Sequence, residues 1–156
     1  MNRLLKRYFR DPREFRSIQA ACGALIVDDF ARYLFARQEG CYQYFELYLN
    51  RQELLRVRDY LIEEGYSFRG NEVESCTSCT GIDEDGQRRG ILINLGKSLA
   101  GSLARAFECA NTTASFCIIS WEKAYCIFPS TTFLTHEAFL VRDVDDRQLE
   151  AAKRGE

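Results

Sequence analysis

The residues of this chain best suited to phosphate or metal chemistry are three carboxylates placed at two apolar runs. Asp28 and Asp29 directly follow the run 24–27, and Glu46 lies inside the alternating run 42–49. Carboxylates that lie close together can hold Mg²⁺, which prefers oxygen ligands and neutralises charge on a transferring phosphoryl group. The structural alternative is that Asp28 and Asp29 cap the next helix while Glu46 is a solvated strand residue. The sequence leaves both interpretations open.

Two cysteines suggest a second kind of site, a metal centre. Cys76 and Cys79 form a lone Cys-x-x-Cys pair, and the one histidine, His136, is distant in sequence. A structural zinc site normally takes a second pair of cysteines or histidines. We therefore expect no zinc site, and Glu46, Cys76 and Cys79 are only weak metal candidates.

The cysteine count and the lack of targeting signals predict the compartment. The chain has seven cysteines, an odd number, and no apolar stretch typical of a signal peptide. This pattern predicts free thiols in a reducing, cytoplasmic or nuclear environment. Cys117 and Cys126 stand among apolar residues, so we expect them in the core. No run reaches the length of a membrane span, which predicts no membrane partner.

Two further patterns do not support a catalytic site. Gly96-Lys97-Ser98 resembles the end of a phosphate-binding loop, but five residues separate Gly90 from Gly96 where that motif has four, and Ile91 stands at the required glycine. His136 is more typical of a structural or exposed histidine than of a catalytic one. A Cys–His pair stays open, because such partners meet in space rather than in sequence.

Charge argues against nonspecific nucleic-acid binding. The net charge is −2, from 21 basic and 23 acidic residues, whereas nucleic-acid binding normally needs a basic excess. The N-terminal stretch is nevertheless basic, with Arg3, Lys6, Arg7, Arg10, Arg13 and Arg16 against Asp11 and Glu14. Such a stretch is usually a solvated helix face, and the alternative is an arm that binds phosphate or a partner. We expect no nucleic-acid partner.

Apolar patterning predicts one α/β (α+β) domain over residues 1–156, a mixed β-sheet flanked by helices. Asp11 as a cap, Pro12 at the first helical position and Gly23 as a stop define the clearest helix. We predict strands at 24–27, 42–49, 73–82, 90–95 and 114–120, and a final strand or extended piece at 133–141. Further helices are predicted at 2–9, 30–35, 51–64, 97–108, 121–126 and 143–154.

Several segments resemble the nucleotidyltransferase superfamily. The block 23–50 reads strand, turn, helix, strand, which is similar to the opening of the nucleotidyltransferase fold. It is most similar to a group of uncharacterised fungal proteins whose corresponding stretch reads Ser-Gly-Ser, a Phe-rich helix, and Ser-Asp-Leu-Asp-Leu-Tyr-Val. The segments 8–16 and 120–133, the latter with Ser-Trp-Glu-Lys-Ala-Tyr, also resemble that group. The resemblance predicts a nucleotidyltransferase-like fold.

The resemblance also implies a degenerate active site. In that superfamily a Gly-Ser turn approaches the nucleotide phosphates, and two carboxylates one residue apart on a strand hold magnesium. The Gly-Ser positions fall here on Asp28 and Asp29, which repel phosphate, and the carboxylate positions fall on Tyr44 and Glu46. A third carboxylate is implied within 90–95, where no Asp or Glu occurs. One carboxylate cannot hold two magnesium ions in the usual way.

We therefore expect a catalytically inactive nucleotidyltransferase-like domain, without a cofactor, that acts by binding another protein or itself. Exposed aromatics would support this role, and Tyr42, Tyr44 and Tyr48 are candidates, although they could equally pack under a helix. The alternative hypothesis is a nucleotide-binding enzyme or a nucleotidyltransferase that uses a reorganised site of the three carboxylates with Mg²⁺ and a nucleotide.

Overall fold

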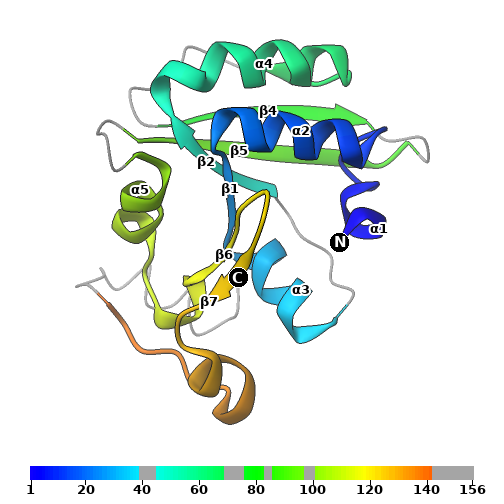
Figure 1. Cartoon of the computed structure of the whole chain (residues 1–156). Helices are drawn as coiled ribbons and strands as arrows, with labels where there is room; N and C mark the ends of the chain where they lie inside the picture. Colours follow the sequence, from blue (N-terminus) through cyan, green and yellow to red (C-terminus); the bar gives the residue numbers. More distant parts are fainter. Residues whose placement is uncertain (39–44, 69–75, 83–85, 97–100, 142–156) are drawn as a thin grey trace.

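A computed structural model describes residues 1–38, 45–68, 76–82, 86–96 and 101–141, which form one sheet with helices packed against it (Figure 1). The helices are α1 (Asn2–Leu5), α2 (Pro12–Cys22), α3 (Asp29–Ala36), α4 (Leu54–Glu63) and α5 (Gly101–Cys109). The strands are β1 (Leu25–Val27), β2 (Phe45–Asn50), β3 (Ser67–Phe68), β4 (Cys76–Ile82), β5 (Arg88–Gly96), β6 (Cys117–Ile119) and β7 (Ala124–Cys126). Two 3₁₀ segments, η1 (Arg51–Glu53) and η2 (Thr113–Ser115), and a π-helical segment, η3 (Ser130–Thr135), complete the described chain.

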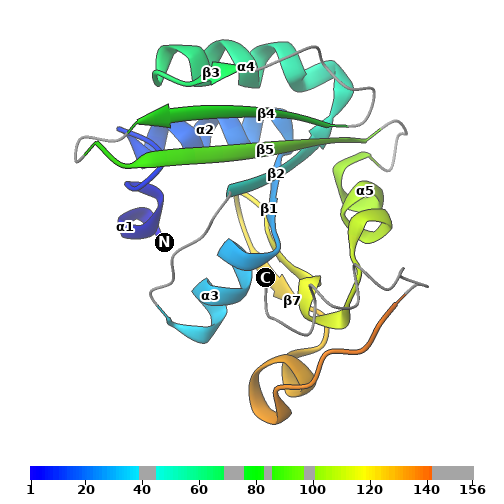
Figure 2. The same cartoon turned by 180° about the vertical axis from the view of Figure 1, so that it is seen from behind.

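The sheet mixes parallel and antiparallel strands in the order β3-β4-β5-β2-β1-β6-β7. β2 runs parallel to β5, which places Glu46 beside Leu92 and Tyr48 beside Asn94. The other described pairs are antiparallel. A parallel pair needs a crossover, and α4, β3 and β4 lie between β2 and β5 in sequence. The predicted mixed sheet flanked by helices is confirmed, and Figure 2 shows the same layers from behind.

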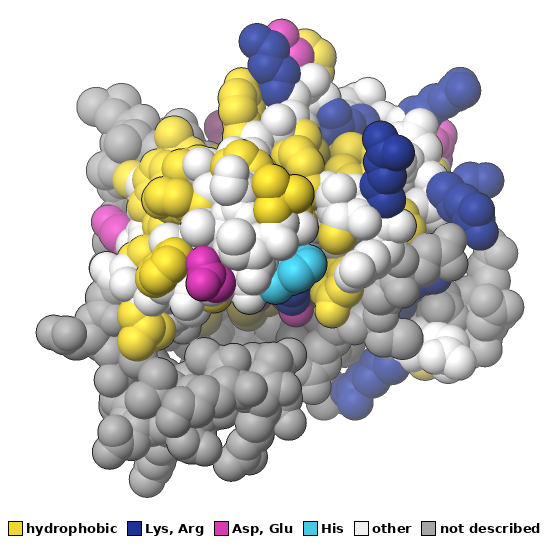
Figure 3. Space-filling view, turned by 90° about the horizontal axis from the view of Figure 1, so that it is seen from below, with side chains coloured by type: hydrophobic (Ala, Val, Ile, Leu, Met, Phe, Trp, Pro, Cys, Tyr) yellow, Lys and Arg dark blue, Asp and Glu magenta, His cyan; other side chains and the backbone are white. Residues whose placement is uncertain are grey.

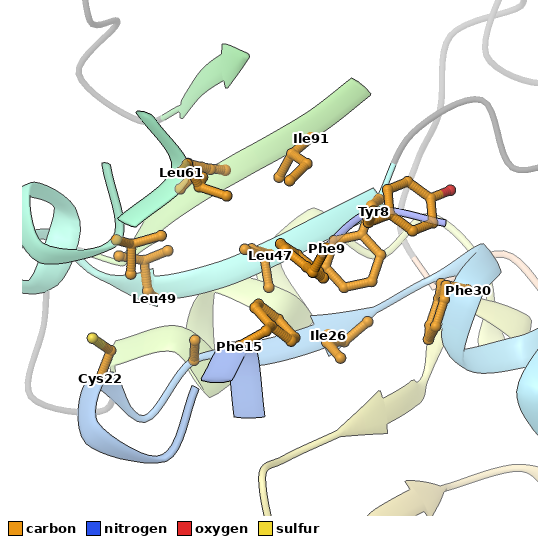
Figure 4. Packing of buried hydrophobic residues seen from close by; sticks show 14 of the residues in the cluster. Tyr8, Phe9, Phe15, Cys22, Ile26, Phe30, Leu47, Leu49, Leu61 and Ile91 are labelled. Atoms are coloured by element: carbon orange, nitrogen blue, oxygen red, sulfur yellow. The ribbon is translucent and has the colours of Figure 1, made fainter. Parts of the chain in front are cut away.

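The larger hydrophobic core lies on the sheet face covered by α2 and α4. Phe45, Leu47 and Leu49 alternate inward from β2, as the sequence predicts. Phe9 stacks on Phe15 with 3.8 Å between ring centroids, and Phe45 meets both rings edge-on. Figure 4 shows Phe9, Phe15 and Leu47 close together in this cluster. Each buried aromatic side chain removes about 150–250 Å² from water, so this cluster contributes strongly to folding.

The opposite face of the sheet carries a smaller core under α5. This helix contacts β5, β2 and β1. The buried members of the smaller core are Val27, Tyr48, Ala106 and Ile118. α5 also approaches the end of β2 closely, because a Cβ added to Gly101 would lie 1.9 Å from Oδ1 of Asn50.

Helix α2 begins and ends at the residues that the sequence predicts. Oδ1 of Asp11 accepts a hydrogen bond from the backbone N–H of Arg13 at 2.8 Å, and Pro12 occupies the first helical position. Gly23 ends the helix with φ 57°, in the left-handed region that suits glycine. These signals act within the helix itself, so tertiary contacts do not shift the ends of the helix.

The segment 121–126, predicted as a short helix, is instead the turn and second strand of a hairpin. Oγ of Ser120 accepts hydrogen bonds from the N–H groups of Glu122 and Lys123 at 3.3 and 2.9 Å. This closes a tight turn, after which β7 pairs with β6. An isolated helix shorter than about 12 residues is marginal in water, so the pairing of β7 with β6 determines the conformation of this segment.

The segment 133–141, predicted as a final strand or an extended piece, does not form a strand. Residues 130–135 form η3, and the stretch after it makes only an isolated bridge between Thr112 and Leu140. β7 is the last strand on this side of the sheet, and no described residue of 133–141 pairs with it.

Some predictions fall outside the described residues, namely the polar helix 143–154, the start of the strand at 73–75 and the start of the helix at 97–100. Among the helices that are described, none has the length and apolar character that crossing a membrane requires.

Candidate functional site

The structure brings Asp28, Asp29 and Glu46 together where β1 leads into α3. The register of β1 and β2 places Val27 opposite Glu46, so Asp28, one residue later, lies at the same point of the sheet. Asp28 and Glu46 are half-buried, whereas Asp29 is exposed at the first position of α3. Proximity of the three carboxylates was one of the two interpretations that the sequence left open, and only Asp28 and Glu46 lie in a shielded environment.

Two neutral side chains hold the carboxylate of Glu46. Its Oε2 accepts a hydrogen bond from Oη of Tyr48 at 3.2 Å and another from Nδ2 of Asn94 at 3.3 Å. Tyr48 stands two residues further along β2, and Asn94 is its partner on the parallel strand β5. One face of two adjacent strands thus presents Glu46, Tyr48 and Asn94 as a connected group, and the acid in it already has two donors.

Burial makes both half-buried carboxylates weak acids. Burial and, second, the charge of Asp28 raise the pKa of Glu46 to about 7, against the lowering effect of the hydrogen bonds from Tyr48 and Asn94. Burial likewise raises the pKa of Asp28 to about 6, helped by the charge of Asp29 and opposed by Arg32 and a hydrogen bond from Ser115. Near neutral pH the site therefore holds less negative charge than its residue types suggest.

Asp28 has a backbone conformation that suits glycine. Its φ is 64° and its ψ is −139°, a combination that side chains with a Cβ rarely adopt. Its side chain makes no capping hydrogen bond to α3, so the alternative role of Asp28 as a helix cap is not realised. The strand-to-helix turn thus keeps a glycine-type geometry while carrying a carboxylate.

Asp29 pairs with a residue of its own helix. Its Oδ1 lies 2.6 Å from the guanidinium of Arg32, one helical turn further on. Both side chains are partly exposed, so this pair contributes little to stability. Asp29 is therefore engaged with Arg32 beside the site and is turned to solvent.

The described part of β5 offers no third carboxylate to this group. Its residues beside Glu46 and Tyr48 are Leu92 and Asn94. Within the described ranges no three His, Cys, Asp or Glu side chains are placed to hold a metal ion. Tyr44, at the other position implied for a carboxylate, lies outside the described residues, as does Tyr42.

Cys76 and Cys79 project to opposite faces of β4. Residues three apart on a strand alternate in direction, and the register places Cys76 beside Asn94 and Cys79 beside Ile91. Cys79 is buried in the larger core, and burial raises the pKa of its thiol to about 12. This geometry does not bring the two sulfurs to a common metal ion.

The basic N-terminal stretch makes structural contacts at two positions. The backbone N–H of Arg10 donates to Oε2 of the buried Glu64 at 2.7 Å, and the guanidinium of Arg10 lies 3.6 Å from the same carboxylate. Arg16 donates to the backbone oxygens of Ser120 and Trp121.

His136 is exposed at the end of η3.

Tyr48 and Asn94 are the site residues that the sequence analysis missed as donors. Of the two alternatives left open for Tyr48, an exposed aromatic or packing under a helix, the structure has the second, because its side chain is only 4% exposed under α5. The signal for Asn94 was present, since it is the one polar residue in the apolar run 91–95. A polar side chain in a buried strand needs a hydrogen-bond partner, and Glu46 is that partner.

Comparison with known proteins supports the fold and no closer relationship. No protein-family model matches the chain, and no curated protein matches it significantly. A solved structure of a CCA-adding enzyme, apo form I, superposes with a TM-score of 0.56 at 11% sequence identity. The match covers 98% of this chain and 38% of that one, so this chain spans well under half of the length of its structural neighbour. The chain thus has a nucleotidyltransferase-like fold.

Proposed function

We propose that this chain is a nucleotidyltransferase-fold domain that does not catalyse nucleotidyl transfer and instead associates with a second copy of itself. The proposed lack of catalysis rests on the hydrogen bonding of the Glu46 carboxylate. Its Oε2 is bound by Tyr48 and Asn94, and the adjacent strand presents Leu92 and Asn94 to it. A carboxylate held in this way by neutral donors acts as a structural acceptor.

The electrostatics of the site favour this interpretation. Binding of Mg²⁺ requires ionised carboxylates, and the pKa values of Asp28 and Glu46 are raised to about 6 and about 7. Asp28 and Asp29 also place negative charge at the turn where a phosphate would have to approach. Two-metal catalysis works by neutralising charge on phosphoryl oxygens, and in the described part of the chain no three His, Cys, Asp or Glu side chains are placed to hold a metal ion.

The second half of the proposal rests on an apolar surface at the β7 edge of the sheet. We define it by eight residues that are each between 39% and 77% exposed, namely Trp121, Tyr125, Ile127, Phe128, Leu134, Phe139, Leu140 and Val141. Figure 3, which views the molecule from below, shows hydrophobic side chains distributed over this face among uncharged atoms, with few charged side chains between them. Together they expose on the order of several hundred Å², the scale that marks interaction sites on soluble proteins.

A second copy fits this surface by charge and by backbone pairing. Glu122 and Lys123 lie side by side at the hairpin tip with 3.8 Å between their charged groups. In a two-fold symmetric contact each residue meets the opposite charge of the other copy. β7 pairs only with β6 among the described strands, so its outer edge is open to another strand.

Sedimentation velocity over a range of protein concentrations tests the association. We expect a concentration-dependent dimer that Leu134→Asp converts to a monomer, because Leu134 is the most exposed residue of the apolar surface at 77%. The matched control is Leu55→Asp, which changes a leucine of α4 that is 68% exposed. A wild-type chain that is monomeric at every concentration would contradict self-association and direct the search to a different protein partner.

Thermal unfolding with nucleoside triphosphates, each with and without Mg²⁺, tests the absence of catalysis against the alternative. A ligand at a hundred times its dissociation constant adds about 2.7 kcal/mol, which is several degrees in a domain of this size. We expect no shift. A magnesium-dependent shift that Glu46→Ala abolishes would support the alternative, a nucleotide site rebuilt from Asp28, Asp29 and Glu46, which their proximity favours.

A further inference from the structure

Two cysteine thiols face each other across the hairpin of β6 and β7. Cys117 and Cys126 are direct partners in the antiparallel register, and their Sγ atoms lie 3.6 Å apart. Both side chains point into the larger core, where Cys117 is fully buried and Cys126 is half-buried. They were expected in the core, but their direct opposition was not expected, because 121–126 was predicted as a helix.

The backbone hydrogen bonds of the hairpin show whether Cys117 and Cys126 form a hydrogen-bonded or a non-hydrogen-bonded pair. The N–H of Ser120 donates to the oxygen of Lys123 at 2.8 Å, and the N–H of Ile127 donates to the oxygen of Phe116 at 3.1 Å. Hydrogen-bonded and non-hydrogen-bonded pairs alternate along an antiparallel ladder. Cys117 and Cys126 therefore occupy a non-hydrogen-bonded position. Cα atoms at such a position are about 4.5 Å apart, which lies within the range that a disulfide spans.

We propose that Cys117 and Cys126 form a redox-convertible disulfide site, oxidised by a low-molecular-weight disulfide such as oxidised glutathione. The geometry needs only a small movement, since the sulfur atoms must close from 3.6 Å to bonding distance without a change in strand register. This inference does not depend on the proposed self-association.

Burial determines the order of the two steps. Cys126 is the accessible thiol, so its thiolate attacks one sulfur of the small disulfide and forms a mixed disulfide, and one small thiol departs. Cys117 then attacks the sulfur of Cys126, and the second small thiol departs with the proton that Cys117 loses. The two cysteines give up two electrons, and the small disulfide is reduced to two thiols.

The environment of Cys117 affects the rate of the second step. Burial and the neighbouring Cys126 raise the pKa of the Cys117 thiol well above its usual range. The thiolate is the attacking species, so closure of the disulfide is the slow step and the mixed disulfide precedes it.

The cross-link acts on the segment that carries the apolar surface. The hairpin holds Trp121 and Tyr125, and Ile127 and Phe128 follow Cys126 directly. A disulfide at the base of this hairpin restrains both strands and limits fraying of the β7 edge. Oxidation is therefore expected to rigidify half of the apolar surface without altering the sheet order.

The test incubates the full chain in glutathione redox buffer, quenches it with acid, blocks free thiols and maps peptides by mass spectrometry. We expect a peptide that joins Cys117 to Cys126 and a rise in Tm of several degrees that a reductant reverses. Cys126→Ser should lose both effects. Cys76→Ser is the matched control and should keep both, because Cys76 is half-buried like Cys126 but lies on β4, which three strands separate from the hairpin.

Two results would overturn the proposal. One is a glutathione adduct that persists on Cys126 with no internal cross-link, and the other is a cross-link that joins different cysteines. The peptide map of the wild-type chain decides between these outcomes even where the Cys126→Ser variant does not fold.

Discussion

Oη of Tyr48 donates a hydrogen bond to Oε2 of Glu46, two residues away on the same face of β2, at 3.2 Å. Tyr48 is buried under α5 and burial raises its pKa far above the usual range, so its phenol stays a neutral donor. Asn94 adds a second neutral donor to the same oxygen. Glu46 is therefore a half-buried acid that accepts hydrogen bonds from two neutral donors, beside another acid at Asp28.

The first prediction is that Glu46 makes the protein less stable as the pH rises through the range from about 4.5 to about 7. The pKa of Glu46 rises from 4.5 to about 7 on folding, so in this range the folded state binds more protons than the unfolded state. The free energy of unfolding then falls as the pH increases, by on the order of 2–3 kcal/mol in all. Urea unfolding at a series of pH values measures this slope.

Glu46→Gln should flatten that slope and exceed the wild type in stability at pH 8, since it keeps an acceptor and carries no charge. Glu63→Gln on α4 is the control, because Glu63 is exposed and far from the site in sequence. Asp28 has a pKa raised to about 6 and adds to the slope in the same direction, so some slope remains in the variant. Equal slopes for Glu46→Gln and the wild type would show that Glu46 is already ionised near its ordinary pKa.

The second prediction concerns the backbone of Asp28. Asp28→Gly and Asp28→Ala both remove the carboxylate, but only glycine suits φ 64° with ψ −139°. We expect Asp28→Gly to be more stable than Asp28→Ala by about 1–2 kcal/mol in urea unfolding at one fixed pH. Similar stabilities of the two variants would mean that the turn relaxes to an ordinary conformation when the aspartate is replaced.

Local signals explain what the sequence predicted correctly. The cap at Asp11 and the stop at Gly23 act within one helical turn, and the alternation of Phe45, Leu47 and Leu49 reports directly on the buried face of β2. The proximity of Asp28 to Glu46, one of two interpretations that the sequence left open, comes from the pairing of β1 with β2 in the sheet.

The remaining features depend on contacts between distant segments. The hydrogen bond of Asn94 to Glu46 joins residues 48 positions apart, and the burial of Tyr48 requires α5 on the second face of the sheet. The pairing of Cys117 with Cys126 requires the strand β7. The apolar pattern at 121–126 is too short to distinguish a strand from a helix, and it was predicted as a helix. Short segments take their conformation from their neighbours, so single-sequence patterns fail there first.

The third prediction is that Gln19 is a stabilising polar residue of the core. Its Nε2 donates to the backbone oxygens of Ala24 and Ile119, each at 3.0 Å, and so ties α2 to the sheet. Gln19→Leu keeps the size but leaves both oxygens without this donor, at about 1–3 kcal/mol for each buried group. We expect a loss of about 2–4 kcal/mol in urea unfolding. Ser17→Ala, an exposed change on the same helix, should stay within about 0.5 kcal/mol.

The fourth prediction is that Gly101 sets the distance between α5 and the end of β2. A Cβ at Gly101 would meet Oδ1 of Asn50 at 1.9 Å, whereas a Cβ at Gly86 meets nothing within 4 Å, and both glycines have positive φ. Gly86→Ala should therefore report the backbone cost alone, about 1 kcal/mol, and Gly101→Ala should cost about 1–3 kcal/mol more.

The double variant Gly101→Ala with Asn50→Ala isolates the collision from the backbone term. It removes Oδ1 from the path of the new Cβ, so its loss of stability should be smaller than the sum of the two single losses. Simple additivity would show that α5 moves away from β2 to admit the alanine. Such a movement would also disturb the smaller core, to which Ala106 and Tyr48 both belong, and the slope of stability with pH that Glu46 produces would change with it.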